Sequence, residues 1–101
     1  MSNSGEGAES MVRNGESYLK EEKYDEALEC FTKAEKKLIL EHPTEDSQFD
    51  NYYNLNVQLY EGKANAYKAK GDGVFEEMSR KQALKSATAL KNHKDQQERI
   101  S

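Results

Sequence analysis

The stretch from Glu21 to Leu38 combines a high density of charge with helical spacing of its apolar residues. Ten of its eighteen residues are charged, yet the others recur mostly at intervals of three or four, as on one face of an α-helix. Two of them are alanines, where a helix that needs only an apolar stripe would carry leucine or isoleucine. The pattern predicts a helix that a neighbouring helix approaches closely, through Tyr24, Ala27, Leu28, Phe31, Ala34 and Leu38.

Similar periodicity predicts three further helices, separated by recognisable breaks. Pro43 ends the second helix, because proline disfavours helical geometry at the preceding residue and has no N–H to donate. Glycine readily adopts positive φ after a helix, so the Gly-Asp-Gly segment at 71–73 predicts a turn. Ser47, with Asp50 three residues later, resembles a capping box. We expect a disordered leader at 1–7, helices at 8–21, 24–41, 49–70 and 74–91, and a polar tail at 92–101 that frays.

The third predicted helix has two adjoining apolar stripes, so it should contact more than one neighbour and lie at the centre of the fold. The fourth has a weaker pattern, with Phe75 and Met78 followed by a slightly rotated stripe. Gly15 lies inside the first helix, where glycine costs about 1 kcal/mol relative to alanine, so we expect a close helix–helix approach there. The two stripes of the third helix are Tyr53, Val57, Tyr60, Ala64 and Tyr67, and Tyr52, Leu55, Leu59 and Ala66.

Composition argues against several classes of function. The net charge of −4 disfavours a nucleic-acid binder, which needs a basic face. A single cysteine, Cys30, excludes an internal disulfide and is expected to pack as a small hydrophobe. His42 and His93 have no metal-ligand spacing and are expected to be exposed to solvent. No apolar run is long enough to span a bilayer. We therefore expect a cytoplasmic protein without membrane insertion, enzymatic activity, metal or cofactor.

One segment resembles the tetratricopeptide repeat (TPR), a hairpin of two helices in 34 residues. The resemblance covers about residues 8–91 and implies a short α-solenoid of two repeats, made of four helices in antiparallel hairpins. The second copy is looser, with Tyr60, Lys63, Ala64 and Tyr67, and it begins 49 positions after the first rather than 34. The last helix departs further from the repeat pattern. The first copy is carried by Met11, Asn14, Gly15, Tyr18, Ala27, Phe31 and Ala34.

The resemblance implies a non-enzymatic protein-interaction module, a TPR-type adaptor or co-chaperone-like scaffold that binds a peptide or helix of a partner protein in its concave groove. One version of the family binds the C-terminal tails of the chaperones Hsp70 and Hsp90 through two first-helix positions, which here are Val12 and Glu16. Because Glu16 would repel a carboxylate, we do not expect those tails as ligands. The implied groove residues are Glu9, Val12, Glu16, Leu19, Lys20, Gln58, Glu61, Asn65 and Lys68.

Two alternatives remain open at the level of sequence. A trafficking domain of the microtubule-interacting-and-trafficking (MIT) type, a three-helix bundle of similar size, shares part of the pattern. A structural subunit is the other alternative, because two repeats leave the outer face of the last helix uncovered. Such a subunit would form a homodimer or larger complex through Val74, Met78, Ala83 and Ala87.

Overall fold

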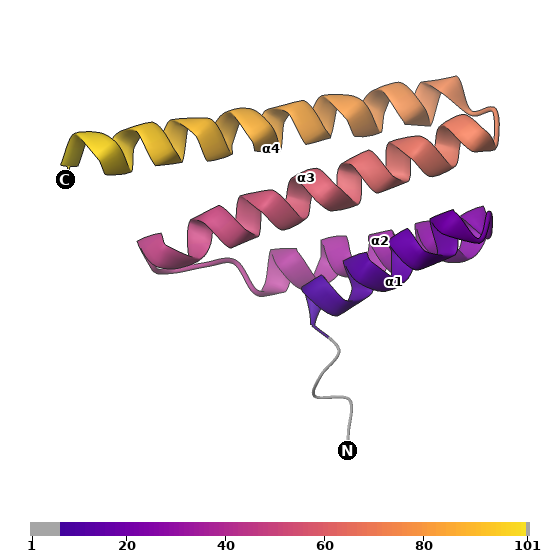
Figure 1. Cartoon of the computed structure of the whole chain (residues 1–101), viewed down its shortest axis with the longest axis horizontal. Coiled ribbons are helices and arrows are strands. Elements are labelled where there is room, and N and C mark those ends of the chain that lie inside the picture. The colour runs from indigo at the N-terminus through magenta and orange to yellow at the C-terminus, as the bar shows by residue number, and fades with distance from the viewer. Residues whose placement is uncertain (1–6, 101) are drawn as a thin grey trace, which may run out of the picture.

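The computed structural model describes residues 7–100, which form four α-helices and no strand. They are α1 (Ala8–Lys20), α2 (Tyr24–Leu40), α3 (Asp46–Ala69) and α4 (Gly73–Ile100). Consecutive helices run antiparallel, so α1 and α2 form one hairpin and α3 and α4 form a second (Figure 1). The predicted all-α fold of antiparallel helix hairpins is confirmed.

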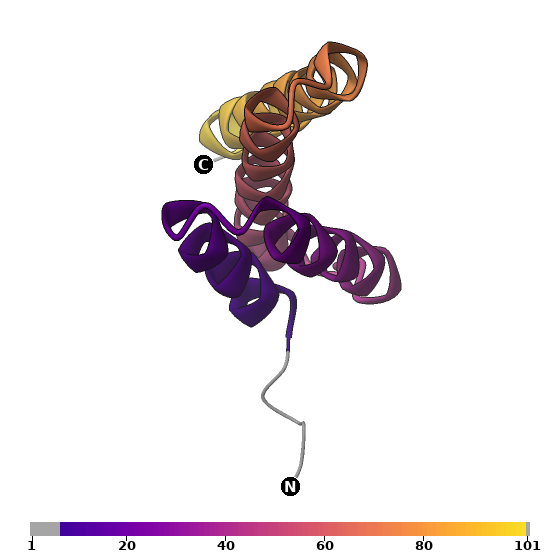
Figure 2. The same ribbon diagram turned by 90° about the vertical axis from the view of Figure 1, so that its right-hand side faces the viewer.

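Helix α3 lies at the centre of the molecule, as its two apolar stripes predict. It packs against α4 on one side and against α2 and α1 on the other. Viewed from the end, the second hairpin stands across the first at an angle, and α4 lies mostly on the side of α3 away from α1 and α2 (Figure 2). The first hairpin therefore packs against the second mainly through α3.

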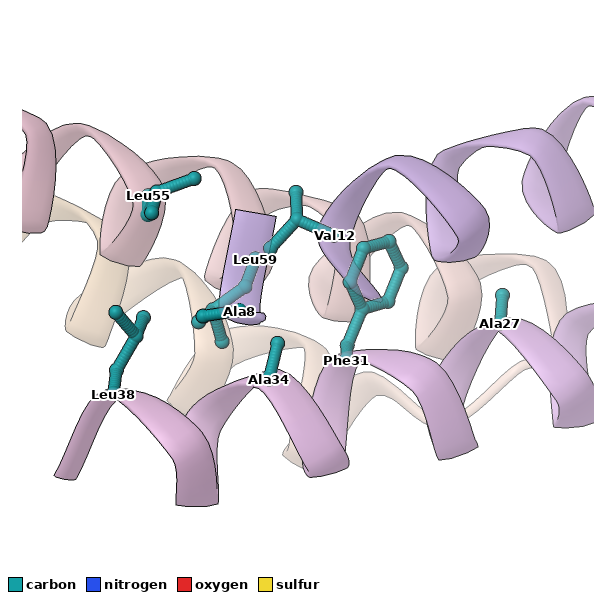
Figure 3. Close-up of a cluster of buried hydrophobic side chains, with 8 residues drawn as sticks. All are labelled: Ala8, Val12, Ala27, Phe31, Ala34, Leu38, Leu55 and Leu59. Atoms are coloured by element: carbon teal, nitrogen blue, oxygen red, sulfur yellow. The ribbon is translucent and has the colours of Figure 1, made fainter. Parts of the chain in front are cut away.

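The core explains the small residues of the sequence. The Phe31 ring is fully buried, and it points from α2 toward α1 beside Val12 (Figure 3). A Cβ added at Gly15 would lie 2.7 Å from this ring, and one added at Gly62 of α3 would lie 2.3 Å from it. Both glycines are needed because a single aromatic ring fills the space between three helices. The buried cluster consists of Ala8, Val12, Ala27, Phe31, Ala34, Leu38, Leu55 and Leu59.

Both hairpins turn through the same hydrogen-bond pattern. After α1, the Lys23 N–H donates to the Tyr18 carbonyl at 2.9 Å, and after α3 the Asp72 N–H donates to the Tyr67 carbonyl at 2.9 Å. This six-to-one bond is the Schellman motif, which needs one residue with positive φ. Gly71 supplies it after α3, with φ 80°, as the turn prediction requires; Glu22 supplies it after α1, with φ 62°.

The start of α3 corrects one prediction. The helix begins at Asp46, so Ser47 lies in its first turn and does not act as the N-cap. The N-cap residue is Glu45, whose side chain makes no capping hydrogen bond. Gln48 instead accepts a hydrogen bond from the Thr44 N–H at 3.4 Å. The predicted capping box is therefore wrong.

The end of α4 corrects another. The helix continues to Ile100, so the predicted boundary between 91 and 92 falls inside one helix. Lysine, glutamine, glutamate and arginine are good helix formers, and they dominate this end of the chain. His93 adds a tertiary anchor, because its Nδ1 lies 3.1 Å from Asp50 Oδ1 and its side chain is only 14% exposed. The prediction of an exposed His93 is wrong, whereas His42 is exposed as predicted. Residues 1–6 of the expected leader and Ser101 lie outside the described residues.

Candidate functional site

The groove implied by the repeat resemblance loses its apolar members in the structure. Val12 is fully buried in the core, and Leu19 packs against that core. Val12 is therefore not available to a ligand, and its assignment to a binding groove is wrong, whereas Leu19 is half-buried. Glu16 is half-buried, and the remaining six side chains are exposed and polar: Glu9, Lys20, Gln58, Glu61, Asn65 and Lys68.

Local contacts account for part of this polar strip. Glu9 pairs with Arg13 one turn later, at 2.6 Å. Asn65 accepts a hydrogen bond from Arg80 Nη2 of α4 at 3.3 Å. Such contacts satisfy exposed helix residues without a ligand, and the strip has no large apolar side chain to anchor one.

The structure exposes three of the four residues that were expected on an assembly face of the last helix. Val74, Met78 and Ala87 are exposed, but Ala83 is only 6% exposed, so its place on that face is wrong. Ala83 follows Tyr67 by sixteen residues, as Ala34 follows Tyr18, and both alanines are buried. At this position the last helix therefore has the same spacing as the first hairpin, contrary to the prediction that the last helix departs from the repeat pattern.

Two further apolar side chains join the exposed face of α4. Phe75 is 48% exposed and Leu84 is 67% exposed, compared with 54% for Met78. Leu84 was missed because it lies off both stripes that the sequence pattern indicates. Large apolar side chains that remain exposed together mark candidate interaction surfaces.

A pocket of about 310 Å³ lies where α2, α3 and α4 meet. Its α3 residues, Tyr60, Lys63 and Tyr67, lie on a different side of that helix from the polar strip, given about 3.6 residues per turn. The pocket is therefore separate from the predicted concave groove. It is lined by Glu35, Tyr60, Lys63, Tyr67, Phe75, Met78, Ser79 and Gln82.

One wall of this pocket is polar and internally paired. The Glu35 carboxylate accepts a hydrogen bond from the Tyr60 hydroxyl at 2.6 Å and one from Lys63 Nζ at 3.1 Å. Burial raises the pKa of Tyr60, and the hydrogen bond to Glu35 and the negative charge of that carboxylate raise it further. The Tyr60 proton is therefore held firmly, and the charge of Glu35 is balanced by that of Lys63. This cluster fixes α3 against α2.

The other wall is apolar and continues along α4. The rings of Tyr67 and Phe75 stack with centroids 5.2 Å apart. Met78 and Gln82 line the pocket and also line a second hollow of about 390 Å³, which contains Leu84. The two hollows together form a continuous surface, here called the α4 groove, lined on α4 by Phe75, Met78, Ser79, Lys81, Gln82, Leu84 and Lys85.

Within residues 7–100, no group of three or more histidine, cysteine or acidic side chains could hold a metal ion. Over the same residues, no helix combines the length and apolar character needed to cross a membrane. Cys30 is half-buried on α2, as a small packing residue would be.

Comparison with known proteins adds no relative. No protein-family model, no curated protein and no solved structure matches this chain. The residues of the α4 groove and their arrangement are therefore the basis for assigning a function.

Proposed function

We propose that this chain is a non-enzymatic protein-interaction module that binds a peptide or helix of a partner protein in the α4 groove. The observation that carries the proposal is the set of exposed apolar side chains in two adjoining hollows that share Met78, with Phe75 in one and Leu84 in the other. Partner binding would remove these side chains from water, which contributes about 25 cal/mol for each Å² of apolar surface buried.

The α4 groove is a better binding site than the polar strip of α1 and α3. Interfaces derive most of their binding energy from a few large side chains in a well-packed centre, with polar residues at the rim. In the α1–α3 strip, the two apolar candidates are used by the core. In the α4 groove, the apolar side chains remain exposed beside lysine and glutamine.

The proposed class of function, a protein-binding module, is the one that the sequence predicts. The module would act as an adaptor or scaffold of the TPR type in the cytoplasm. The antiparallel hairpins and the close packing of Gly15 against Phe31 support the TPR assignment. The site would differ from the concave groove that the resemblance implies.

The MIT-type alternative is favoured by one observation. Every member of the buried cluster lies in α1, α2 or α3, so these three helices have a core without α4. In that arrangement a partner motif would bind between helices of the first three, and α4 would be an addition. Variants on α4 separate this alternative from the main proposal.

The test compares two variants of equal charge change. The intact chain, a Met78→Glu/Leu84→Glu variant and a Gln58→Glu/Asn65→Glu variant are used to capture proteins from a lysate of the source organism. A captured protein is then purified, and its dissociation constant is measured for all three chains. We expect the α4 variant to lose binding and the α3 variant to retain it. Retention by the α4 variant would refute the proposed site.

A further inference from the structure

The charge of this chain is divided unevenly along its length. The whole chain carries 15 basic and 19 acidic residues, for a net charge of −4. Between Met78 and Lys94, however, there are five basic residues and no acidic one. The rest of the chain consequently carries ten basic and 19 acidic residues. Most of α4 is thus a basic segment on an acidic protein: Arg80, Lys81, Lys85, Lys91 and Lys94.

Two of these cations lie in the α4 groove. Lys81 and Lys85 line the same hollow as Met78 and Leu84. Lys81 lies 3.6 Å from Glu77, but both side chains are more than 70% exposed, so water screens this pair. Lys85 makes no ion pair within residues 7–100. The apolar floor of the groove is therefore bordered by cations that remain open to a ligand.

Two acidic residues near the groove are paired with cations, and a third, Glu77, lies beside Lys81. Glu35 pairs with Lys63 at 3.1 Å and also accepts the Tyr60 hydrogen bond. Glu76 pairs with Arg80 at 3.0 Å. A ligand in the groove would therefore face a positive rim, and complementary negative charge would speed and stabilise its docking.

The spacing of the apolar side chains matches a helical ligand. Met78 and Leu84 line the same hollow and are six residues apart on one helix, which corresponds to about 9 Å at 1.5 Å per residue. An amphipathic helix presents anchors at i, i+3 or i+4, and i+7, over a similar length. Phe75 lines the adjoining hollow with Met78 and points half a helical revolution away from Leu84, so Met78 and Leu84 are the contact points for a single ligand helix.

Resting on the protein-binding function above, we propose that the occupant of the α4 groove is an acidic amphipathic segment of a partner protein. Its apolar side chains contact Met78 and Leu84, and its carboxylates face Lys81 and Lys85, all of which line one hollow. An anionic membrane fits less well, because an interfacial helix needs a broad apolar face. Here lysines separate the apolar side chains, and Glu76 and Glu77 begin the same helix.

The experiment is a selection from a phage-displayed library of random 16-residue peptides on the folded chain. We expect the enriched peptides to be acidic, with apolar residues at helical spacing. Binding of synthetic versions is then measured by fluorescence anisotropy at 50 and 300 mM NaCl. Charge reversal in Lys81→Glu/Lys85→Glu should weaken binding at least about tenfold at low salt, since like charges would then face each other.

A matched control separates a local effect from a change in net charge. Lys20→Glu/Lys68→Glu changes the net charge by the same amount on the α1–α3 strip and should leave peptide affinity within about twofold. Equal loss in both variants would overturn the inference, because only overall charge would then matter. Circular dichroism of each variant checks that the helices remain folded.

The outcomes distinguish failure of this inference from failure of the proposed function. Enrichment of neutral or basic peptides that lose binding on Met78→Glu/Leu84→Glu would overturn the acidic partner and keep the groove. No enrichment at all would count against both. Binding to phosphatidylcholine vesicles with 30% phosphatidylserine that Lys81→Glu/Lys85→Glu abolishes would overturn the inference in favour of a lipid surface. Concentration-dependent dimers abolished by the same variant would overturn it in favour of a second copy.

Discussion

The two hairpins share one register but differ in the side chains that occupy it. Several positions of the first hairpin are matched 49 residues later in the second, through the turn and into the last helix. Both hairpins close through the same hydrogen-bond pattern. Both also bury an alanine sixteen residues after the tyrosine whose carbonyl accepts the turn hydrogen bond. The matched pairs are Tyr18 with Tyr67, Glu22 with Gly71, and Ala34 with Ala83.

The decisive difference lies at Phe31. Its counterpart at the same offset is Arg80, which is exposed and bonds to Glu76 and Asn65. The first hairpin therefore has a large aromatic anchor between α1, α2 and α3, and the second has none. Without such an anchor, the apolar side chains of α4 remain on its outer surface. The same spacing of residues therefore gives a closed core around Phe31 in the first hairpin and an exposed apolar surface on α4 in the second.

Removal of the anchor should have the largest effect. Phe31→Ala leaves a cavity among three helices and should lower the free energy of unfolding by about 3–5 kcal/mol. Phe75→Ala also removes an aromatic ring, but from the second hairpin, where the side chain is half exposed, and should cost about 1 kcal/mol or less. Urea unfolding followed by circular dichroism measures both. Similar losses would show that the second hairpin has an equivalent anchor.

Filling the space beside the ring should have the next largest effect. Gly62→Ala places a Cβ 2.3 Å from Phe31 Cζ, and overpacking of this kind costs about 1–3 kcal/mol. The gain in helix propensity, about 1 kcal/mol, offsets only part of that cost. Gly73→Ala in the second hairpin meets no atom within 4 Å and should change the melting temperature little. If Phe31 limits the space, adding Phe31→Leu to Gly62→Ala should recover part of the loss.

The stability that the Tyr60–Glu35 contact provides between the two hairpins should decrease at alkaline pH. The pKa of Tyr60 is raised in the folded state above its ordinary value of about 10. The associated stability is present below pH 10 and is lost as the pH rises, because ionisation of this tyrosine then favours the unfolded chain. Tyr60→Phe should cost about 1 kcal/mol at neutral pH. Its stability should also fall less than that of the wild type between pH 9 and pH 11; an unchanged slope would contradict this account.

Substitutions in the two turns should have the smallest effects on stability, and the two effects should have opposite signs. Glu22 has φ 62°, a conformation that disfavours side chains with a Cβ, so Glu22→Gly should stabilise the first turn by about 1 kcal/mol. Gly71→Ala introduces that cost into the second turn and should destabilise the chain by a similar amount. Thermal unfolding of the two variants measures the difference. Shifts of the same sign would show that the turns are not equivalent.

Sequence periodicity was sufficient for the helices and for part of the core. The alanines at 27 and 34 and Gly15 predicted close helix packing, and all three are buried. These predictions succeed because side-chain period and residue size act locally and through one neighbouring helix. The expected end at 91 failed because the His93 side chain packs against α3, a contact between residues 43 positions apart.

The candidate site depended on tertiary structure. Val12 and Leu19 were predicted to line a groove, but a pattern along one helix cannot tell which neighbour covers its apolar side. Glu35, Tyr60 and Lys63 come from two helices, and only their packing brings the three groups into contact. The exposed Leu84 and the buried Ala83 are adjacent in sequence and differ only because α3 covers one side of α4. The sequence by itself thus determined the helices, the close contacts and the acid-free basic segment of α4. The packing of α4 mainly on α3 decided that its apolar side chains stay exposed to solvent, because burial depends on how many neighbours a helix has.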